Sequence, residues 1–236
     1  MPIRLMIHGA SGRMGQALVR LCGECPDLQL VAAVAGRHAP SIEGVPGFTT
    51  AQLDRVPAFD VCIDFSLPDA FDPMLAFCVE RGAALVSGTT GLNEAQMARF
   101  DTAAAHVPVL WAANFSLGVA ILSDLVRRAA QALPQWQRDI VESHHIHKQD
   151  APSGTALALG RAVVEGGGPE PHYASLRAGD IIGEHLVQFT GMGERIELIH
   201  RATHRDIFAR GALHCATALA GRPAGRYSLM DLLVSA

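Results

Sequence analysis

The sequence predicts an α/β fold in two parts, a larger domain on a parallel sheet and a smaller α+β domain. In the first half, short apolar runs alternate with helical patterns, which is typical of parallel strands joined by helices. After residue 172, glycine turns separate the apolar runs instead, which favours an open mixed sheet. We therefore expect one domain at residues 1–115 with 209–236, and the other at 116–208.

The composition limits the class of protein. The 236-residue chain has a net charge of −4 and no dense basic run, so we expect no nucleic acid partner. No apolar run approaches the roughly 18 residues of a membrane span, and the N-terminus lacks a signal-peptide pattern. We therefore expect a cytoplasmic protein without a membrane partner. Its five cysteines fit reduced thiols, and we interpret Cys22 and Cys25 as buried rather than as a redox or zinc pair.

The N-terminus predicts a strand, a glycine turn and a helix. Residues 3–8 are apolar, residues 9–15 carry glycine at every third position, and Leu18 and Leu21 begin a helical pattern. Residues 28–34 supply the next strand. This βαβ order is typical of a Rossmann-like dinucleotide-binding domain, where glycines allow a tight turn and close approach to the pyrophosphate. A plain strand-to-helix turn is the alternative, and the βαβ context favours nucleotide binding.

The end of the second strand bears on cofactor choice. Such folds commonly carry an acid there for the adenosine ribose, or a basic residue for an added 2′-phosphate. Ala35 provides no acid, whereas Arg37 and His38 follow directly. We therefore interpret Arg37 as a candidate contact for a 2′-phosphate, which favours NADPH. A solvated loop arginine is the alternative.

The remaining elements follow in order. In the first domain we expect strands at 59–65, 83–86 and 107–113 and a helix at 70–81. The loops after these strands should face the cofactor, because ligands bind at the carboxyl ends of parallel strands. A helix at 117–133 leads into the second domain, which we expect to hold a helix reaching residue 165 and strands at 173–176, 185–190 and 195–200. A final helix at 208–219 returns to the first domain.

The chemistry is concentrated in residues 142–155, which contain three histidines, a lysine and a Ser-Gly-Thr sequence. Pro152 excludes a continuous helix here, and Ser153 is well placed to cap a helix that begins near Thr155, so we expect a strand, a loop and then a helix start. Free N–H groups at that helix start, together with Lys148, favour a pocket for a small carboxylate-bearing molecule. Phosphate would fit the same donors.

A metal site is the alternative for these side chains. Zinc or iron would need ligands such as Glu142, His144, His147 and Asp150. We expect no metal, because His144 and His145 are adjacent and should point to opposite faces of a strand. The other histidines are interpreted as structural, namely His147, His185, His200 and His214.

Several motifs, in this order, resemble the 4-hydroxy-tetrahydrodipicolinate reductase family, also called dihydrodipicolinate reductases. The most specific are His-His-x-x-Lys at 144–148 and Asp-Ala-Pro-Ser-Gly-Thr-Ala at 150–156. The others lie at 9–15, 64–66, 88–91, 112–115 and 177–185, so the resemblance spans nearly the whole chain.

The resemblance implies NADPH- or NADH-dependent reduction of 4-hydroxy-tetrahydrodipicolinate to tetrahydrodipicolinate in the diaminopimelate and lysine pathway. It implies a homotetramer whose second domain binds the dicarboxylate substrate and forms subunit contacts. His144 would donate the proton and Lys148 would be a second donor. The substrate carboxylates would be held by His145, Lys148, Ser153, Gly154 and Thr155. The dinucleotide would be bound by Gly9, Ala10, Ser11, Gly12, Arg13, Met14, Gly88, Thr89, Thr90, Ala112, Ala113, Asn114 and Phe115.

The chemistry of the residues agrees with these roles. Histidine, with a reference pKa of about 6.5, suits proton donation near neutral pH, and Lys148 suits carboxylate binding. Because cofactor and substrate would lie on different domains, we also expect hinge closure around 114–117 and near Phe208. One alternative is another NAD(P)-dependent dehydrogenase of a small amino-acid-derived substrate, which would lack the His-His-x-x-Lys loop. A nucleotide-sensing regulator is the other, and the sequence offers no output domain for it.

Overall fold

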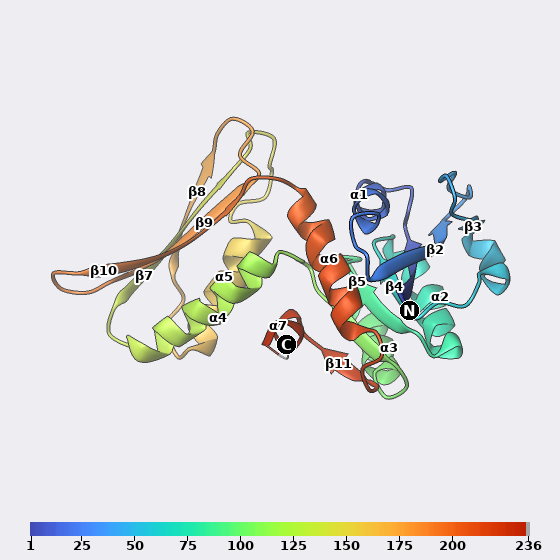
Figure 1. The fold of residues 1–236 in the computed structure, drawn as a ribbon. Helices are drawn as coiled ribbons and strands as arrows, with labels where there is room; N and C mark the ends of the chain where they lie inside the picture. The colour runs from blue at the N-terminus through green and yellow to red at the C-terminus, as the bar shows by residue number, and fades with distance from the viewer. Residues whose placement is uncertain (235–236) are drawn as a thin grey trace. The chain divides into compact units, whose positions relative to one another are not determined.

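The computed structural model describes residues 1–234, which fall into two compact units. Unit 1 contains Met1–Phe115 and the chain from Phe208 onward, and unit 2 contains Ser116–Ile207. The chain therefore crosses between units after Phe115 and again after Ile207 (Figure 1). Within residues 1–234, no helix is both long enough and apolar enough to span a lipid bilayer.

Unit 1 is built on a seven-stranded parallel sheet with the strand order β11-β6-β5-β4-β1-β2-β3. The order reverses direction at β1, which pairs with both β2 and β4. Open α/β sheets bind ligands at such a switch point, outside the carboxyl ends of the strands. The strands are β1 (Ile3–His8), β2 (Leu28–Ala35), β3 (Gly47–Thr49), β4 (Val61–Asp64), β5 (Ala84–Ser87), β6 (Pro108–Trp111) and β11 (Gly225–Tyr227).

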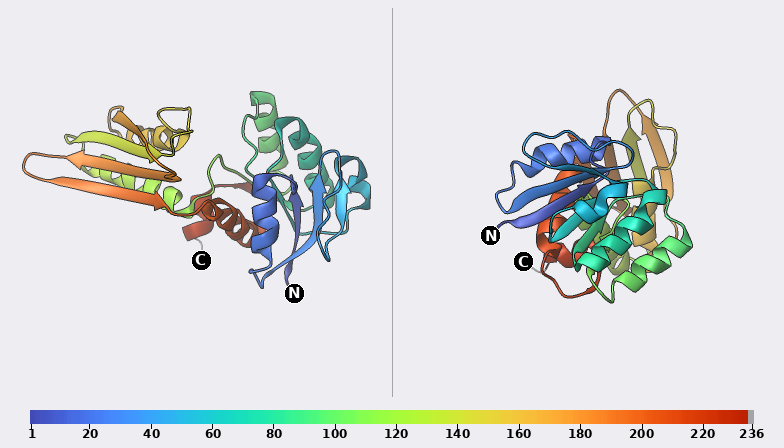
Figure 2. Two further views of the ribbon diagram at one scale, coloured as in Figure 1. Left: turned by 90° about the horizontal axis from the view of Figure 1, so that it is seen from above. Right: turned by 90° about the vertical axis from the view of Figure 1, so that its right-hand side faces the viewer.

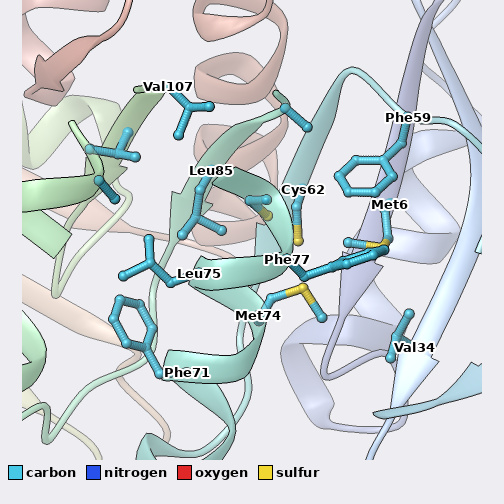
Figure 3. Close-up of a cluster of buried hydrophobic side chains, with 14 of the residues drawn as sticks. Met6, Val34, Phe59, Cys62, Phe71, Met74, Leu75, Phe77, Leu85 and Val107 are labelled. Atoms are coloured by element: carbon cyan, nitrogen blue, oxygen red, sulfur yellow. The ribbon is translucent and has the colours of Figure 1, made fainter. Parts of the chain in front are cut away.

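Helices cover both faces of this sheet (Figures 1 and 2). The helices are α1 (Arg13–Cys22), α2 (Pro68–Arg81), α3 (Glu94–Ala103), α6 (Asp206–Leu219) and α7 (Leu229–Val234), with a 3₁₀ helix η1 (Thr50–Arg55). On one face, α2 and α3 bury a cluster that includes Met6, Cys62 and Phe71 (Figure 3). Pro68 lies in the first turn of α2, where its missing N–H is not needed, and Gly82 ends the helix with a φ of 63°.

Unit 2 has a four-stranded mixed sheet in the order β10-β9-β7-β8. β7 (Gln137–His144) runs parallel to β8 (His172–Arg177) and antiparallel to β9 (Gly183–Thr190), which pairs antiparallel with β10 (Arg195–Ala202). Alternate residues of β7 and β9 are buried, because one face of the sheet packs against α4 (Leu117–Ala132) and α5 (Gly154–Glu165). This core includes Leu122, Leu159 and Phe189.

The predicted fold class is confirmed, a parallel α/β unit followed by a smaller unit with a mixed sheet. Five short elements were missed: β3, η1, α3, β11 and α7. β3 and β11 each have only three residues, too few for a readable period. α3 did have a signal, since Asn93 and Gln96 form a capping box in which each side chain bonds the backbone of the other.

Candidate active site

The site in unit 2 begins at the carboxyl end of β7. The alternation of the strand places Glu142 and His144 on the same buried face, with relative exposures of 0% and 7%. The Glu142 carboxylate is hydrogen-bonded to Nδ1 of His144. This contact fixes the ring and leaves Nε2, which lies next to Gly183, as the nitrogen able to transfer a proton.

β7 ends at His144, so the expectation that His144 and His145 share a strand was wrong. His145 lies in the following loop, half-buried, with its ring centroid 6.2 Å from that of His147. The two adjacent histidines therefore have different surroundings.

Arg177, at the end of β8, pairs with Glu142. Its Nη2 lies 2.8 Å from Oε1 of Glu142, and its Nη1 lies 3.0 Å from Oε2. The same guanidinium donates to the backbone carbonyl oxygens of Lys148 at 3.3 Å and Asp150 at 2.6 Å. Arg177 thus ties the loop after β7 to the buried carboxylate.

The electrostatics of the two strand residues differ. Burial disfavours the charged form of Glu142, but hydrogen bonds from Arg177, Ser175 and His144 outweigh it and lower the pKa of Glu142 to about 2. Burial lowers the pKa of His144, and the nearby Glu142 opposes this effect in part. Glu142 is therefore a fixed anion beside an imidazole that gives up its proton readily.

The loop from 145 to 153 leads into the start of α5. Ser153 caps this helix as predicted, accepting a hydrogen bond from the Ala156 N–H, and its own N–H donates to Glu142 at 3.3 Å. A Cβ built on Gly154 would meet no heavy atom within 4 Å, so the helix start has room for a ligand. Lys148, the only lysine of the sequence, lies 2.8 Å from Asp150.

His185 on β9 also belongs to this site. It ends the 177–185 motif, but the sequence analysis interpreted it as structural. Its Nε2 lies 3.2 Å from Oγ of Ser153, and its ring meets that of His144 edge-on at a centroid distance of 5.2 Å. Burial lowers the pKa of His185 to about 4, so this ring is neutral near pH 7. The structure thus gathers His144, Lys148, Ser153 and His185 around the start of α5.

The glycine turn of unit 1 lies between β1 and α1. Gly9 has a φ of 80°, and a Cβ there would overlap the carbonyl oxygen of Phe65. Gly12 is the N-cap of α1 and has no side chain to occupy the first N–H groups of the helix. The N–H groups of Gly9 and Ala10 donate to the carbonyl oxygen of Val34, and that of Gly12 donates to Gly9, so the N–H groups offered to an anion such as a pyrophosphate are those of Ser11 and the first turn of α1.

A buried carboxylate, Asp64, lies under the loops at the carboxyl ends of β1, β4 and β5. It accepts hydrogen bonds from Nδ1 of His8, Oγ of Ser87 and Oγ1 of Thr89, each at 2.8 Å. Trp111, at the end of β6, donates to the carbonyl oxygen of Thr89 at 2.8 Å. The sequence analysis included Asp64 only as part of the 64–66 motif. In the structure its carboxylate accepts a hydrogen bond from Thr89, one of the predicted cofactor-binding residues.

Two features lie near the part of unit 1 where the adenosine of the cofactor is predicted to bind. A cavity of about 320 Å³ lies beside the glycine turn, lined by Ala10, Ser11, Gln16, Val19, Arg20, Pro40, Ser41 and Ile42. Arg37 and His38 are exposed in the bend after β2.

Neither the proposed metal ligands nor the cysteine pair forms a metal cluster. Among residues 1–234, no group of three histidine, cysteine or acidic side chains is arranged to hold an ion. Cys22 and Cys25 are free thiols. Cys22 ends α1 and burial raises its pKa to about 11, whereas Cys25 lies beyond the helix and is only half-buried, so the expectation that both are buried was wrong for Cys25.

Two family models together cover almost the whole chain. The description "Dihydrodipicolinate reductase, N-terminus" matches residues 3–115, and "Dihydrodipicolinate reductase, C-terminus" matches residues 118–233. The chain belongs to the dihydrodipicolinate reductase family. This confirms the resemblance seen in the motifs. The C-terminal family model runs past Ile207, so it covers unit 2 and part of the return into unit 1.

Relatives within the dihydrodipicolinate reductase family are similar over their full length. The 4-hydroxy-tetrahydrodipicolinate reductase of Stenotrophomonas maltophilia (strain R551-3) is 66% identical, covering 98% of each chain. The enzyme of the same name from Xanthomonas campestris pv. campestris (strain B100) is 61% identical, covering 99% of this chain and 98% of the other. A dipicolinate-bound dihydrodipicolinate reductase from Paenisporosarcina sp. TG-14 has the same fold, with a TM-score of 0.85 and 23% identity over 97% of this chain and 98% of that one.

Proposed function

We propose that this protein reduces 4-hydroxy-tetrahydrodipicolinate to tetrahydrodipicolinate with NAD(P)H, in the diaminopimelate and lysine pathway. The arrangement that carries the proposal is a buried imidazole, His144, beside Lys148 and an open helix start at Gly154. These groups suit a dicarboxylate that must receive a proton. Relatives that are 59–66% identical carry the name of this activity.

The cofactor fits unit 1. The turn at Gly9 and Gly12 carries no side chain beside the first N–H groups of α1, which suits a pyrophosphate. The loops with Gly88, Thr89, Thr90 and residues 112–115 follow β5 and β6. When bound, NAD(P)H supplies the hydride. Arg37 would contact the 2′-phosphate of NADPH, which makes NADPH the preferred form in this proposal.

The protein's own residues supply the proton and hold the substrate. His144 donates from Nε2, since Nδ1 is engaged by Glu142. Lys148 binds one carboxylate and stabilises negative charge as it develops on the ring. His145, Ser153, Gly154 and Thr155 hold the carboxylates at the start of α5, where N–H groups and the helix dipole favour an anion.

Three further features belong to the proposal. Unit 1 would bind the dinucleotide and unit 2 the substrate, with hinge closure near 114–117 and Phe208. Small-angle scattering that is identical with and without both ligands would contradict hinge closure.

The protein would be a cytoplasmic homotetramer with its subunit contacts on unit 2, where Ile196 and Ile199 of β10 are each 41% exposed.

A coupled assay tests the proposed reaction. The substrate is generated in place from pyruvate and aspartate semialdehyde by the preceding synthase, and the loss of reduced nicotinamide absorbance is followed with NADPH and NADH separately. We expect oxidation that depends on the synthase product and is faster with NADPH. No oxidation by folded protein that still binds nucleotide would instead favour another small-substrate dehydrogenase.

A further inference from the structure

The carboxylate of Glu142 is hydrogen-bonded to several different residues. It is fully buried, and it accepts hydrogen bonds from His144, from both terminal nitrogens of Arg177 and from the N–H of Ser153. Two of these partners belong to the predicted machinery. One is the proton donor, and the other is the residue that begins α5.

Arg177 extends this network to the remaining part of the site. It also donates to the carbonyl oxygen of its neighbour Leu176 and to those of Lys148 and Asp150, in the loop that carries the only lysine. That loop has no helix or strand between His144 and Gly154 to hold its shape. The side-chain contacts of Arg177 and Glu142 therefore fix a segment that the backbone leaves irregular.

We propose that Glu142 and Arg177 are a positioning pair that sets the geometry of His144, the Lys148 loop and the start of α5 together. This proposal rests on the proposed function only for the roles of His144, the Lys148 loop and the start of α5 in the reaction. Neither residue needs to touch the substrate, since Glu142 acts through His144 and Ser153, and Arg177 acts through Glu142 and two carbonyl groups.

The physical case for positioning comes from burial. A buried ion pair seldom adds net stability over a well-packed apolar pair, so its value lies in the orientation it enforces. The fork of Arg177 matches the two oxygens of Glu142, and a lysine cannot reproduce that geometry. A carboxylate on one imidazole nitrogen also selects which nitrogen exchanges protons.

The pair also biases the protonation of His144. The charged and titratable groups that face this ring are Glu142 on β7, Arg177 on β8, Lys148 in the loop and His185 on β9. Of these, Glu142 alone favours the imidazolium, whereas Lys148 and Arg177 oppose it. Loss of the Glu142 charge should therefore lower the pKa of His144. Because a protonated donor is required, the alkaline limb of activity should move to lower pH.

The test compares E142Q with E184Q in the full chain. Glu184 of β9 is the control, because it pairs with Arg201 of β10 at 3.2 Å, its side chain is 40% exposed, and it lies opposite Ser143 of β7. For E142Q we expect kcat to fall by about tenfold or more, as for a misplaced general acid. We expect an unchanged KM for NADPH, and an alkaline limb at lower pH. E184Q should match the wild type in all three.

A second measurement does not depend on activity. The imidazole of His144 is titrated by NMR in wild type, E142Q and E184Q, with H144Q used to assign the resonance. We expect a lower pKa of His144 in E142Q alone. If the wild type lacks reductase activity, this titration still tests the pair, so failure of the proposed function is distinguishable. An unshifted titration in folded E142Q would overturn the positioning role of Glu142.

R177K tests the other partner. It keeps the charge but loses the fork and the reach to two carbonyl groups, so we expect a lower kcat with the alkaline limb in place. This variant also carries the test if E142Q does not fold, as judged by circular dichroism. Folded R177K with wild-type kcat would overturn the proposal.

Discussion

The hydroxyl oxygen of Ser153 lies 3.2 Å from Nε2 of His185, so a histidine on β9 holds the residue that caps α5. The hydroxyl oxygen also accepts from the Ala156 N–H at 3.2 Å, so this one side chain joins the start of α5 to β9. Burial lowers the pKa of His185 to about 4, so a neutral imidazole makes this contact near pH 7. The cap is thereby locked in one rotamer at the place where the substrate should bind.

Ser153→Ala should weaken both the helix and the substrate site. Loss of a serine cap costs about 1 kcal/mol of unfolding free energy. We expect a similar loss in urea unfolding, together with a raised KM for the substrate. Asn93→Ala is the control, since Asn93 caps α3 in unit 1 and accepts a hydrogen bond from the Gln96 N–H at 2.9 Å. It should cost a comparable free energy and leave that KM in place. An unchanged KM in Ser153→Ala would remove Ser153 from the substrate site.

Lys148→Ala should abolish most turnover while the protein still binds NADPH. Removal of a cation that stabilises developing charge should lower kcat by about 100-fold. Fluorescence titration with NADPH should give the wild-type affinity. Lys148→Arg keeps the charge and should retain part of the substrate binding. Loss of NADPH affinity in Lys148→Ala would assign the lysine to the cofactor site instead.

Asp64→Asn should destabilise unit 1 and weaken NADPH binding, because the amide keeps only one of the two oxygens that accept from His8 and Thr89. An unsatisfied buried group costs about 1–3 kcal/mol. Asp60→Asn is the control, since Asp60 pairs with Arg4 at the surface and should contribute little. Urea unfolding and NADPH titration of both variants measure the difference. Equal stability of the two would contradict this role of Asp64.

The same carboxylate gives a pH dependence with a definite sign. Burial raises the pKa of Asp64, but hydrogen bonds from His8, Ser66 and Thr89 outweigh it and leave the pKa below its usual value. A lowered pKa in the folded state stabilises the protein above the unfolded pKa of about 3.9 and less so as pH falls through the folded value. The gap in unfolding free energy between wild type and Asp64→Asn should therefore narrow in acid. A constant gap from pH 7 into the acid range would be inconsistent with this origin.

Arg37→Ala should weaken NADPH binding selectively. A guanidinium on a 2′-phosphate contributes through a charge-assisted hydrogen bond, and NADH has no such phosphate. We expect the KM for NADPH to rise at least about fivefold while that for NADH stays unchanged. Equal effects on both cofactors would reject the 2′-phosphate contact.

The sequence predicted most of the turns, helix caps and strands, but few of the side-chain contacts between neighbouring strands. The turn at Gly9, the cap at Ser153 and the strand before His144 each depend on neighbours in the chain, and each occurs in the structure. The ion pair of Glu142 with Arg177 depends on the parallel register of β7 and β8, in which Glu142 lies opposite Ser175. That register is set by the α5 crossover and by packing, so no short motif reveals it.

The contacts of His185 likewise depend on strand pairing and could not be predicted from the sequence. Its sequence context, a buried position in an alternating strand, is that of an ordinary core histidine. Only the antiparallel pairing of Glu142 with His185 brings its ring to Ser153 and His144. The family motifs led to the predicted donors, His144 and Lys148, and the strand pairing shows which side chains surround His144.

Because Lys148 is the only lysine in 236 residues, the protein has a single side-chain amine, and it lies in the candidate active site. Amine-directed reagents therefore have one side-chain target. A fluorophore or an isotopic methyl group attached there would report on the site without any engineered cysteine or removal of competing lysines. Protection of this amine by a dicarboxylate would give a direct binding signal from the native chain.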